Sequence, residues 1–103
     1  MLLLNIDYIP GKEIEALGMV KGAVVQSKHF GKDFMAGMKT LVGGEITSYT
    51  EMLAEARQIA TERMIAEAEK LGADAVVNVR YGSSGIMQGA AEVVAYGTAV
   101  IIK

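Results

Sequence analysis

The residues best suited to metal or acid–base chemistry lie between Ser27 and Glu45. His29 is the only histidine in the chain, Asp33 follows it within one helical turn, and Glu45 comes after a pair of glycines. Imidazole nitrogen and carboxylate oxygen both bind divalent metal ions. One hypothesis is therefore a metal site formed by His29, Asp33 and Glu45. It remains the alternative hypothesis, because soft heavy metals favour thiolates and the chain has no cysteine.

Nucleophilic catalysis would need a serine beside a histidine and an acid. Ser27 or Ser48 could be combined with His29 and Asp33, but neither serine lies in a G-x-S-x-G nucleophile elbow. A second imidazole for a two-histidine acid–base arrangement is absent from the sequence. We expect no enzyme, and His29 acting as a general base is the least favoured hypothesis.

The stretch "LVGGEITSYTEMLAEAR" contains the double glycine Gly43–Gly44, followed at once by Glu45. One interpretation is a turn between two helices, since glycine readily adopts the left-handed conformation that ends a helix. The other is a ligand cradle, in which free amides at a helix start bind an anion. Glu45 places a negative charge at the same spot, so we favour the turn.

The composition bounds the class of protein. A length of 103 residues indicates one domain, over residues 1–103. The formal net charge of −2 argues against a nucleic-acid partner. The apolar start "MLLLNID" is too short for a signal peptide, and no apolar run approaches the ~20 residues that span a bilayer. We expect a cytoplasmic protein without a membrane partner.

The elements that would position these residues alternate between strand and helix patterns. A short strand over residues 2–6 and a Pro10–Gly11 turn precede a long strand, bent or bulged at Gly18 and Gly22. A short helix is expected before Gly43. A long helix follows from Thr47 or Ser48 to Leu71. Ser48 and Glu51 form a capping box at its start, and Gly72 is its C-cap.

The last third of the chain predicts two more strands. Residues 73–81 alternate, with Ala75, Val77, Val79 and Tyr81 expected on one face, and "GSSGIMQGA" is expected to be an irregular connection. The final strand, "EVVAYGTAVII", is apolar on both faces. A sheet with one helical layer should have one polar face. The second face therefore needs a cover, and we expect another copy of the chain to provide it in a cyclic homo-oligomer.

Several motifs resemble the YbjQ-like family, which is also described as a heavy-metal-binding domain family. They are a "VKG" strand, the "GGEITSY" junction, the "RQIA" helix, "GADAV" and "AYGTAV". The positions that match the family pattern are Gly22, Gly43, Gly44, Glu45, Tyr49, Arg57, Ala60, Gly72, Ala73, Ala75 and Gly97.

The resemblance implies an α+β fold. Its subunit is two-layered and dodecin-like, a small antiparallel β-sheet packed on one long helix plus a short helix, assembled as an oligomeric ring of five copies. It implies no known activity. The polar groups on the first turns of the long helix are Tyr49, Glu51 and Arg57, and we expect them at a subunit interface or in a ligand cleft beside Gly43–Tyr49. The expected protein is a homo-oligomeric binding or scaffold protein whose small ligand is unknown.

Overall fold

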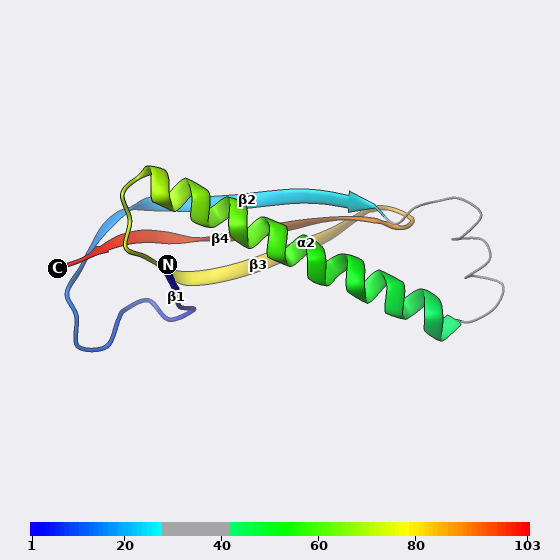
Figure 1. The fold of residues 1–103 in the computed structure, drawn as a ribbon, viewed down its shortest axis with the longest axis horizontal. Coiled ribbons are helices and arrows are strands. Elements are labelled where there is room, and N and C mark those ends of the chain that lie inside the picture. Colours follow the sequence, from blue (N-terminus) through cyan, green and yellow to red (C-terminus); the bar gives the residue numbers. More distant parts are fainter. Residues whose placement is uncertain (28–41) are drawn as a thin grey trace.

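The computed structural model describes residues 1–27 and 42–103, and the side chains of residues 1–27 and 49–103. Its elements are β1 (Leu2–Leu3), β2 (Ile14–Ser27), α2 (Val42–Lys70), β3 (Ala75–Met87) and β4 (Ala90–Ile102). The strands form one sheet in the order β1-β3-β4-β2, and α2 lies diagonally across one face of it (Figure 1). The two-layer α+β prediction is confirmed. The short helix predicted before Gly43 lies outside the described residues.

The sheet is mixed rather than purely antiparallel. β2 and β3 both run antiparallel to β4, as expected. β1 runs parallel to β3 and pairs with it only at Ala75 and Val76. A parallel pair cannot be joined by a tight hairpin and needs a long connection. Between β1 and β3 the chain passes through β2 and α2, which is long enough to allow it.

The long helix α2 begins at Val42, so the predicted helix stop at Gly43–Gly44 is wrong. Two glycines cost about 2 kcal/mol of helix propensity relative to alanine, a loss that a 29-residue helix packed on a sheet can absorb. Ser48 consequently lies within the helix and does not cap it. The predicted end is confirmed. Gly72 has a φ of 79°, and the Ala73 and Gly72 amides donate to the carbonyls of Ala68 and Glu69 at 3.1 and 3.0 Å, which is a Schellman motif.

Small side chains bring α2 close to β2. The buried helix stripe is Ala56, Ala60, Met64 and Ala68, each fully buried. It packs over Gly22, where an added Cβ would overlap the backbone of Ala60 and Met64. Gly22 is therefore required by helix–strand contact. The bulge predicted in β2 at Gly18 is confirmed, since the pairing with β4 shifts between Ala16 and Gly18, but the register does not shift at Gly22.

A bulge in β3 changes which residues share a face. The pairing with β4 shifts between Val77 and Arg80, and Asn78 has a φ of 56°. Ala75 and Val77 consequently lie on the face away from α2, whereas Val79 packs in the core beneath the helix. The predicted single face for Ala75, Val77, Val79 and Tyr81 is wrong, because one extra residue reverses the alternation.

In the described part of the chain, the face of the sheet away from α2 is covered at one end. Ile9, from the segment between β1 and β2, packs there with Ala75, Val77 and Val100. The chain itself thus covers part of the face that we expected another copy to cover. Beyond this contact no described residue covers the face, which we call the open face, and Met19 and Tyr96 are 73% and 39% exposed.

The predicted irregular connection between the last two strands is itself strand. β3 continues to Met87 and β4 begins at Ala90, so only Gln88 and Gly89 form the turn. Gly89 has a φ of 76°, a conformation that glycine favours. Every residue from Tyr81 to Gln88 is exposed. Within the described part of the chain, no helix is long and apolar enough to cross a membrane.

Candidate functional site

The helix positions predicted as a site do not converge. Tyr49 is half-buried, whereas Glu51 and Arg57 are exposed. At 3.6 residues per turn, Glu51 and Arg57 lie about 120° apart around the helix axis, so within one subunit they cannot face one ligand. Gly43, Gly44 and Glu45 lie in the first turn of α2, and the Glu45 side chain is outside the described set.

The predicted metal ligands fall largely outside the described residues. His29 and Asp33 belong to the stretch between β2 and α2 that is not described, and the Glu45 side chain is not described either. Among the described residues, no three His, Cys, Asp or Glu side chains come together to hold a metal ion.

A different group comes together on the open face. Tyr96 of β4 pairs with Lys21 of β2 on one side and with Arg80 of β3 on the other. We call Lys21, Tyr96 and Arg80 the cationic row. Adjacent strands lie about 4.8 Å apart, so the two cations stand roughly 10 Å apart at their backbones, with the tyrosine between them.

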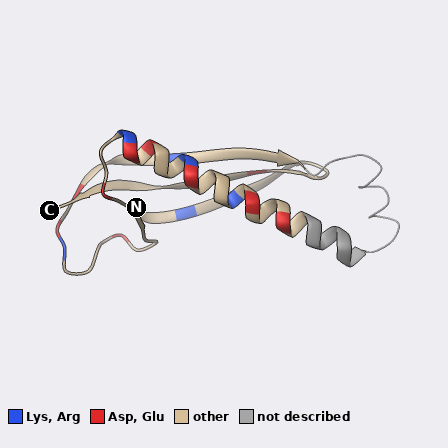
Figure 2. Cartoon of the chain, in the orientation of Figure 1, with Lys and Arg blue, Asp and Glu red and all other residues tan. Residues whose placement is uncertain are grey.

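The burial of the neighbouring residues shows which way the row points. Val20 and Gly22 flank Lys21, and Ala95 and Gly97 flank Tyr96; all four are buried on the side of α2. Since side chains alternate along a strand, Lys21 and Tyr96 project away from the helix. Figure 2 shows that charges are frequent along α2 and sparse on the strands, so two cations beside one aromatic ring are a local concentration.

Arg80 is oriented by the bulge residue. Its Nη2 donates to Asn78 Oδ1 at 3.2 Å, and the Asn78 amide donates to the Ile6 carbonyl at 2.7 Å. Asn78 therefore links the segment that covers part of the open face to the guanidinium. Lys21 makes no ion pair with any described carboxylate.

The outer edge of β2 is held by the helix. The Arg63 guanidinium donates to the Ala23 carbonyl at 2.6 Å, and the Lys21 backbone amide donates to Glu67 Oε1 at 3.2 Å. Both backbone groups would otherwise be unpaired on an edge strand. This edge is therefore protected from pairing with another strand.

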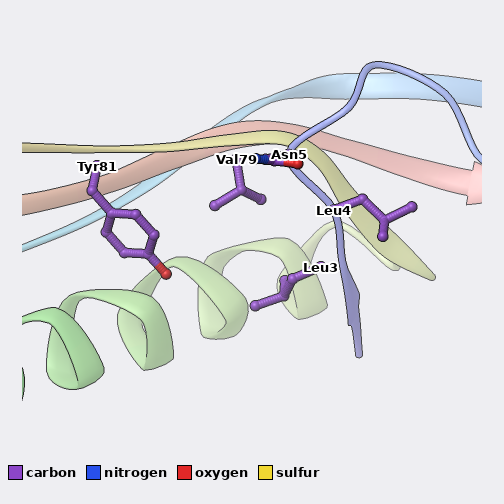
Figure 3. Close-up of a pocket in the computed structure, with 5 residues that line it drawn as sticks. All are labelled: Leu3, Leu4, Asn5, Val79 and Tyr81. Atoms are coloured by element: carbon purple, nitrogen blue, oxygen red, sulfur yellow. The ribbon is translucent and has the colours of Figure 1, made fainter.

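The opposite edge, on β3, is not protected in this way. From Arg80 to Met87, β4 is the only described strand that pairs with β3. A pocket of about 400 Å³ opens at the start of this stretch, lined by Leu3, Leu4, Asn5, Val79 and Tyr81 (Figure 3). The Tyr81 hydroxyl points toward α2 and lies 2.8 Å from Thr61 Oγ1.

Sequence reasoning missed the cationic row. The alternation of Met19, Lys21, Ala23 and Val25 in the sequence could have placed Lys21 opposite the helix. The meeting of Lys21 and Arg80 across Tyr96 depends on the register of three strands and on the bulge at Asn78. Neither is visible in a single sequence.

Comparison with known proteins gives the family. A family model described as "Putative heavy-metal-binding" (YbjQ) matches residues 1–103. A UPF0145 protein from Clostridium novyi (strain NT) is 64% identical over 102 residues, covering 99% of each chain. A UPF0145 protein from Alkaliphilus metalliredigens (strain QYMF) is 61% identical over 100 residues, covering 97% of each.

A solved structure shares the fold. It is a protein of unknown function of the DUF74 family from Pediococcus pentosaceus, similar with a TM-score of 0.65 and 15% identity over 100% of this chain and 98% of that one. At this identity the likeness shows the fold alone. The whole-length family match and the relatives above 60% identity are decisive: this chain belongs to the YbjQ (UPF0145) family, whose function is uncharacterised.

Proposed function

We propose that this protein is a non-enzymatic binding or scaffold protein that acts as a cytoplasmic homo-oligomer. The observation that carries the proposal is the exposed half of β3. Eight consecutive residues, Tyr81–Gln88, are exposed although seven of them belong to β3. From Arg80 onward, the outer edge of β3 pairs with no other described strand, and an unpaired strand edge is a template for pairing with another chain.

Exposed apolar side chains add to this surface. Val25, Ile86 and Met87 are 60%, 51% and 66% exposed, and we call them the hairpin patch. Val25 and Met87 project from the open face, opposite α2. Exposed apolar clusters of this kind mark protein contact surfaces. A second copy that covered the hairpin patch would also cover the end of β4 at Ala90, which pairs with Met87.

The expected assembly is a ring of five dodecin-like subunits, a number and a comparison that come from the family resemblance. In such a ring, Tyr49, Glu51 and Arg57 would meet groups of a neighbouring copy, because one subunit cannot bring them together. The ligand site beside Gly43–Tyr49 would then lie at the boundary between copies.

Native mass spectrometry of protein purified without added metal tests the assembly. We expect a pentamer. Ile86→Lys and Met87→Lys should shift the mass toward smaller species while circular dichroism stays unchanged. The control is Leu71→Lys, because Leu71 is also exposed, at 48%, but follows the last turn of α2. A monomer for the unmodified chain at tens of micromolar would overturn the proposal.

A metal-binding function through His29, Asp33 and Glu45 is the second candidate, and the description of the family supports it. The donor set is unfavourable for a soft metal, since the sequence has no cysteine and one histidine. Calorimetric titration with Zn²⁺ and Cu²⁺ tests it. Loss of binding in His29→Ala would support this site, and binding unchanged by that substitution would exclude it.

A further inference from the structure

We propose that the cationic row is an anion-binding site for a small aromatic phosphate or carboxylate. Lys21 and Arg80 would bind the anionic group, and the ring of Tyr96 would stack against the flat part of the ligand. The proposal goes beyond the binding function proposed above, because it adds a separate site on the open face to the one beside Gly43–Tyr49. It depends on the geometry of the open face and does not require the ring of five.

The charges on this face are complementary to an anion. Two cations flank one residue, and neither makes an ion pair with a described carboxylate. The acidic residue nearest the row on its own strand face is Glu92, which pairs with Val25 and Ser84 and so lies two rows farther along the sheet. An anion above Tyr96 would therefore meet attraction from both sides.

The lengths of the side chains allow both cations to reach one group. Their backbones stand about 10 Å apart, and lysine and arginine side chains each extend roughly 6 Å. A guanidinium donates two parallel hydrogen bonds to a carboxylate or phosphate, which fixes orientation as well as adding affinity. The ammonium adds a more adaptable positive charge.

One hydrogen bond restricts the Arg80 side chain, and a restricted side chain loses less entropy when it binds a ligand. The Asn78 side chain accepts from Nη2, which leaves the other guanidinium N–H groups for a ligand. Asn78 has a left-handed backbone, which is uncommon for a residue other than glycine. We assign Asn78 as a positioning residue.

Tyr96 supplies the aromatic contact. It is 39% exposed and lies between Thr98 and Val94, which project from the same face of β4. The adjacent row includes Met19, which is 73% exposed. A ligand with a flat apolar part would remove these surfaces from water, so an aromatic anion should bind more tightly than inorganic phosphate.

The test is calorimetric titration of the full chain with phenyl phosphate, inorganic phosphate and phenol. Phenyl phosphate should bind most tightly, and its affinity should fall as salt rises. Lys21→Gln and Arg80→Gln should each weaken it about tenfold, as expected for loss of a charge-assisted hydrogen bond. Lys70→Gln is the control, because it removes the same charge from the end of α2.

Two further variants separate the roles. Tyr96→Leu should lower the affinity for phenyl phosphate several-fold and leave the affinity for inorganic phosphate unchanged. Asn78→Gly keeps the left-handed backbone and removes the acceptor for Arg80, so it should weaken both anions without lowering the melting temperature. Chemical-shift changes at Lys21, Arg80 and Tyr96 on adding phenyl phosphate would locate the site.

The outcomes distinguish this proposal from the assembly. Equal affinity in the unmodified chain, Lys21→Gln and Arg80→Gln would overturn the anion site, as would no binding of any probe at millimolar concentration. An intact pentamer in either case would leave the proposed assembly standing. A monomer that binds phenyl phosphate through Arg80 would support the site and overturn the assembly.

Discussion

Gly22 of β2 and Ala60 of α2 lie so close that a methyl group on Gly22 would overlap the Ala60 carbonyl oxygen. This contact brings the helix onto the sheet and lets Arg63 and Glu67, about one and two turns later, reach the β2 backbone. Gly22→Ala should therefore destabilise the protein by about 1–3 kcal/mol, the usual cost of overpacking a core. Chemical denaturation measures the change.

Gly82→Ala is the matched control for Gly22→Ala. Gly82 also lies in a strand, and a Cβ there would meet no atom within 4 Å. The free energy of unfolding of the Gly82→Ala variant should differ from that of the unmodified protein by no more than about 0.5 kcal/mol. Equal losses from the two substitutions would show that the helix does not approach β2 at Gly22.

Arg63 and Glu67 protect the edge of β2, and their loss should expose it. Arg63→Met removes the side-chain donor to the Ala23 carbonyl. Glu67→Gln replaces the charged acceptor of the Lys21 backbone amide with a weaker, neutral one. Each substitution should cost about 1 kcal/mol, typical of one hydrogen bond. The double variant should also form larger species at high concentration in sedimentation velocity, because an unprotected edge pairs with other strands.

Glu69→Gln is the control for this edge. Glu69 lies on the same helix and is exposed, and its side chain makes no hydrogen bond to the sheet among the described contacts. The control should behave like the unmodified chain. Association that is equal in Glu69→Gln and in the double variant would contradict a specific role of the β2 edge.

The pair formed by Lys103 and Glu15 gives stability a pH dependence. Lys103 Nζ lies 2.7 Å from Glu15 Oε1. The hydrogen bond from Lys103, and then its charge, lower the pKa of Glu15 from 4.5. The same hydrogen bond and the charge of Glu15 raise the pKa of Lys103 from 10.5. Both charged forms are therefore favoured in the folded state.

The Glu15–Lys103 pair therefore stabilises the folded state around neutral pH and loses its contribution in acid and in strong base. The lowered pKa of Glu15 contributes stability above 4.5 that is lost as the pH falls through the folded pKa. The raised pKa of Lys103 contributes stability below 10.5 that is lost as the pH rises through the folded pKa. Lys103→Met should slightly lower the melting temperature at neutral pH and flatten its fall in acid.

The effect should be small, because the side chains of Lys103 and Glu15 are 55% and 51% exposed. Lys70→Met is the control, since Lys70 makes no ion pair among the described residues. Melting curves between pH 3 and 7 would contradict the assignment if Lys103→Met and Lys70→Met kept the same acid slope.

The parts of the fold that could be predicted from sequence depend on local periodicity. The stripe Ala56, Ala60, Met64 and Ala68 repeats at helical spacing and is fully buried. Gly72 ends the helix as expected. These features involve residues within a few turns of one another, where the 3.6-residue period is sufficient.

The parts that could not be predicted depend on contacts between distant residues. The bulge at Asn78 depends on how β3 pairs with β4 and with the Ile6 carbonyl. The cationic row joins Lys21 to Arg80, which are far apart in the chain. No local pattern encodes the register that brings them together.

The double glycine is where local reasoning gave the wrong structure, and it offers a direct test. In the structure, Gly43 and Gly44 belong to the first turn of α2. Replacing both with alanine should raise stability by up to about 1 kcal/mol per residue, because alanine has the higher helix propensity. The gain should be smaller if the helix end frays, and thermal melting with circular dichroism measures it.

A turn at the same position would give the opposite sign. Alanine is strained in the left-handed conformation that a helix-ending glycine adopts, so Gly43→Ala with Gly44→Ala would lower the melting temperature. Gly72→Ala provides the comparison within this chain, since Gly72 has that conformation, with a φ of 79°. We expect Gly72→Ala to destabilise the protein by about 1 kcal/mol while the double variant is stabilised. Destabilisation by both would restore the turn at Gly43–Gly44 and would place the start of α2 nearer to Ser48.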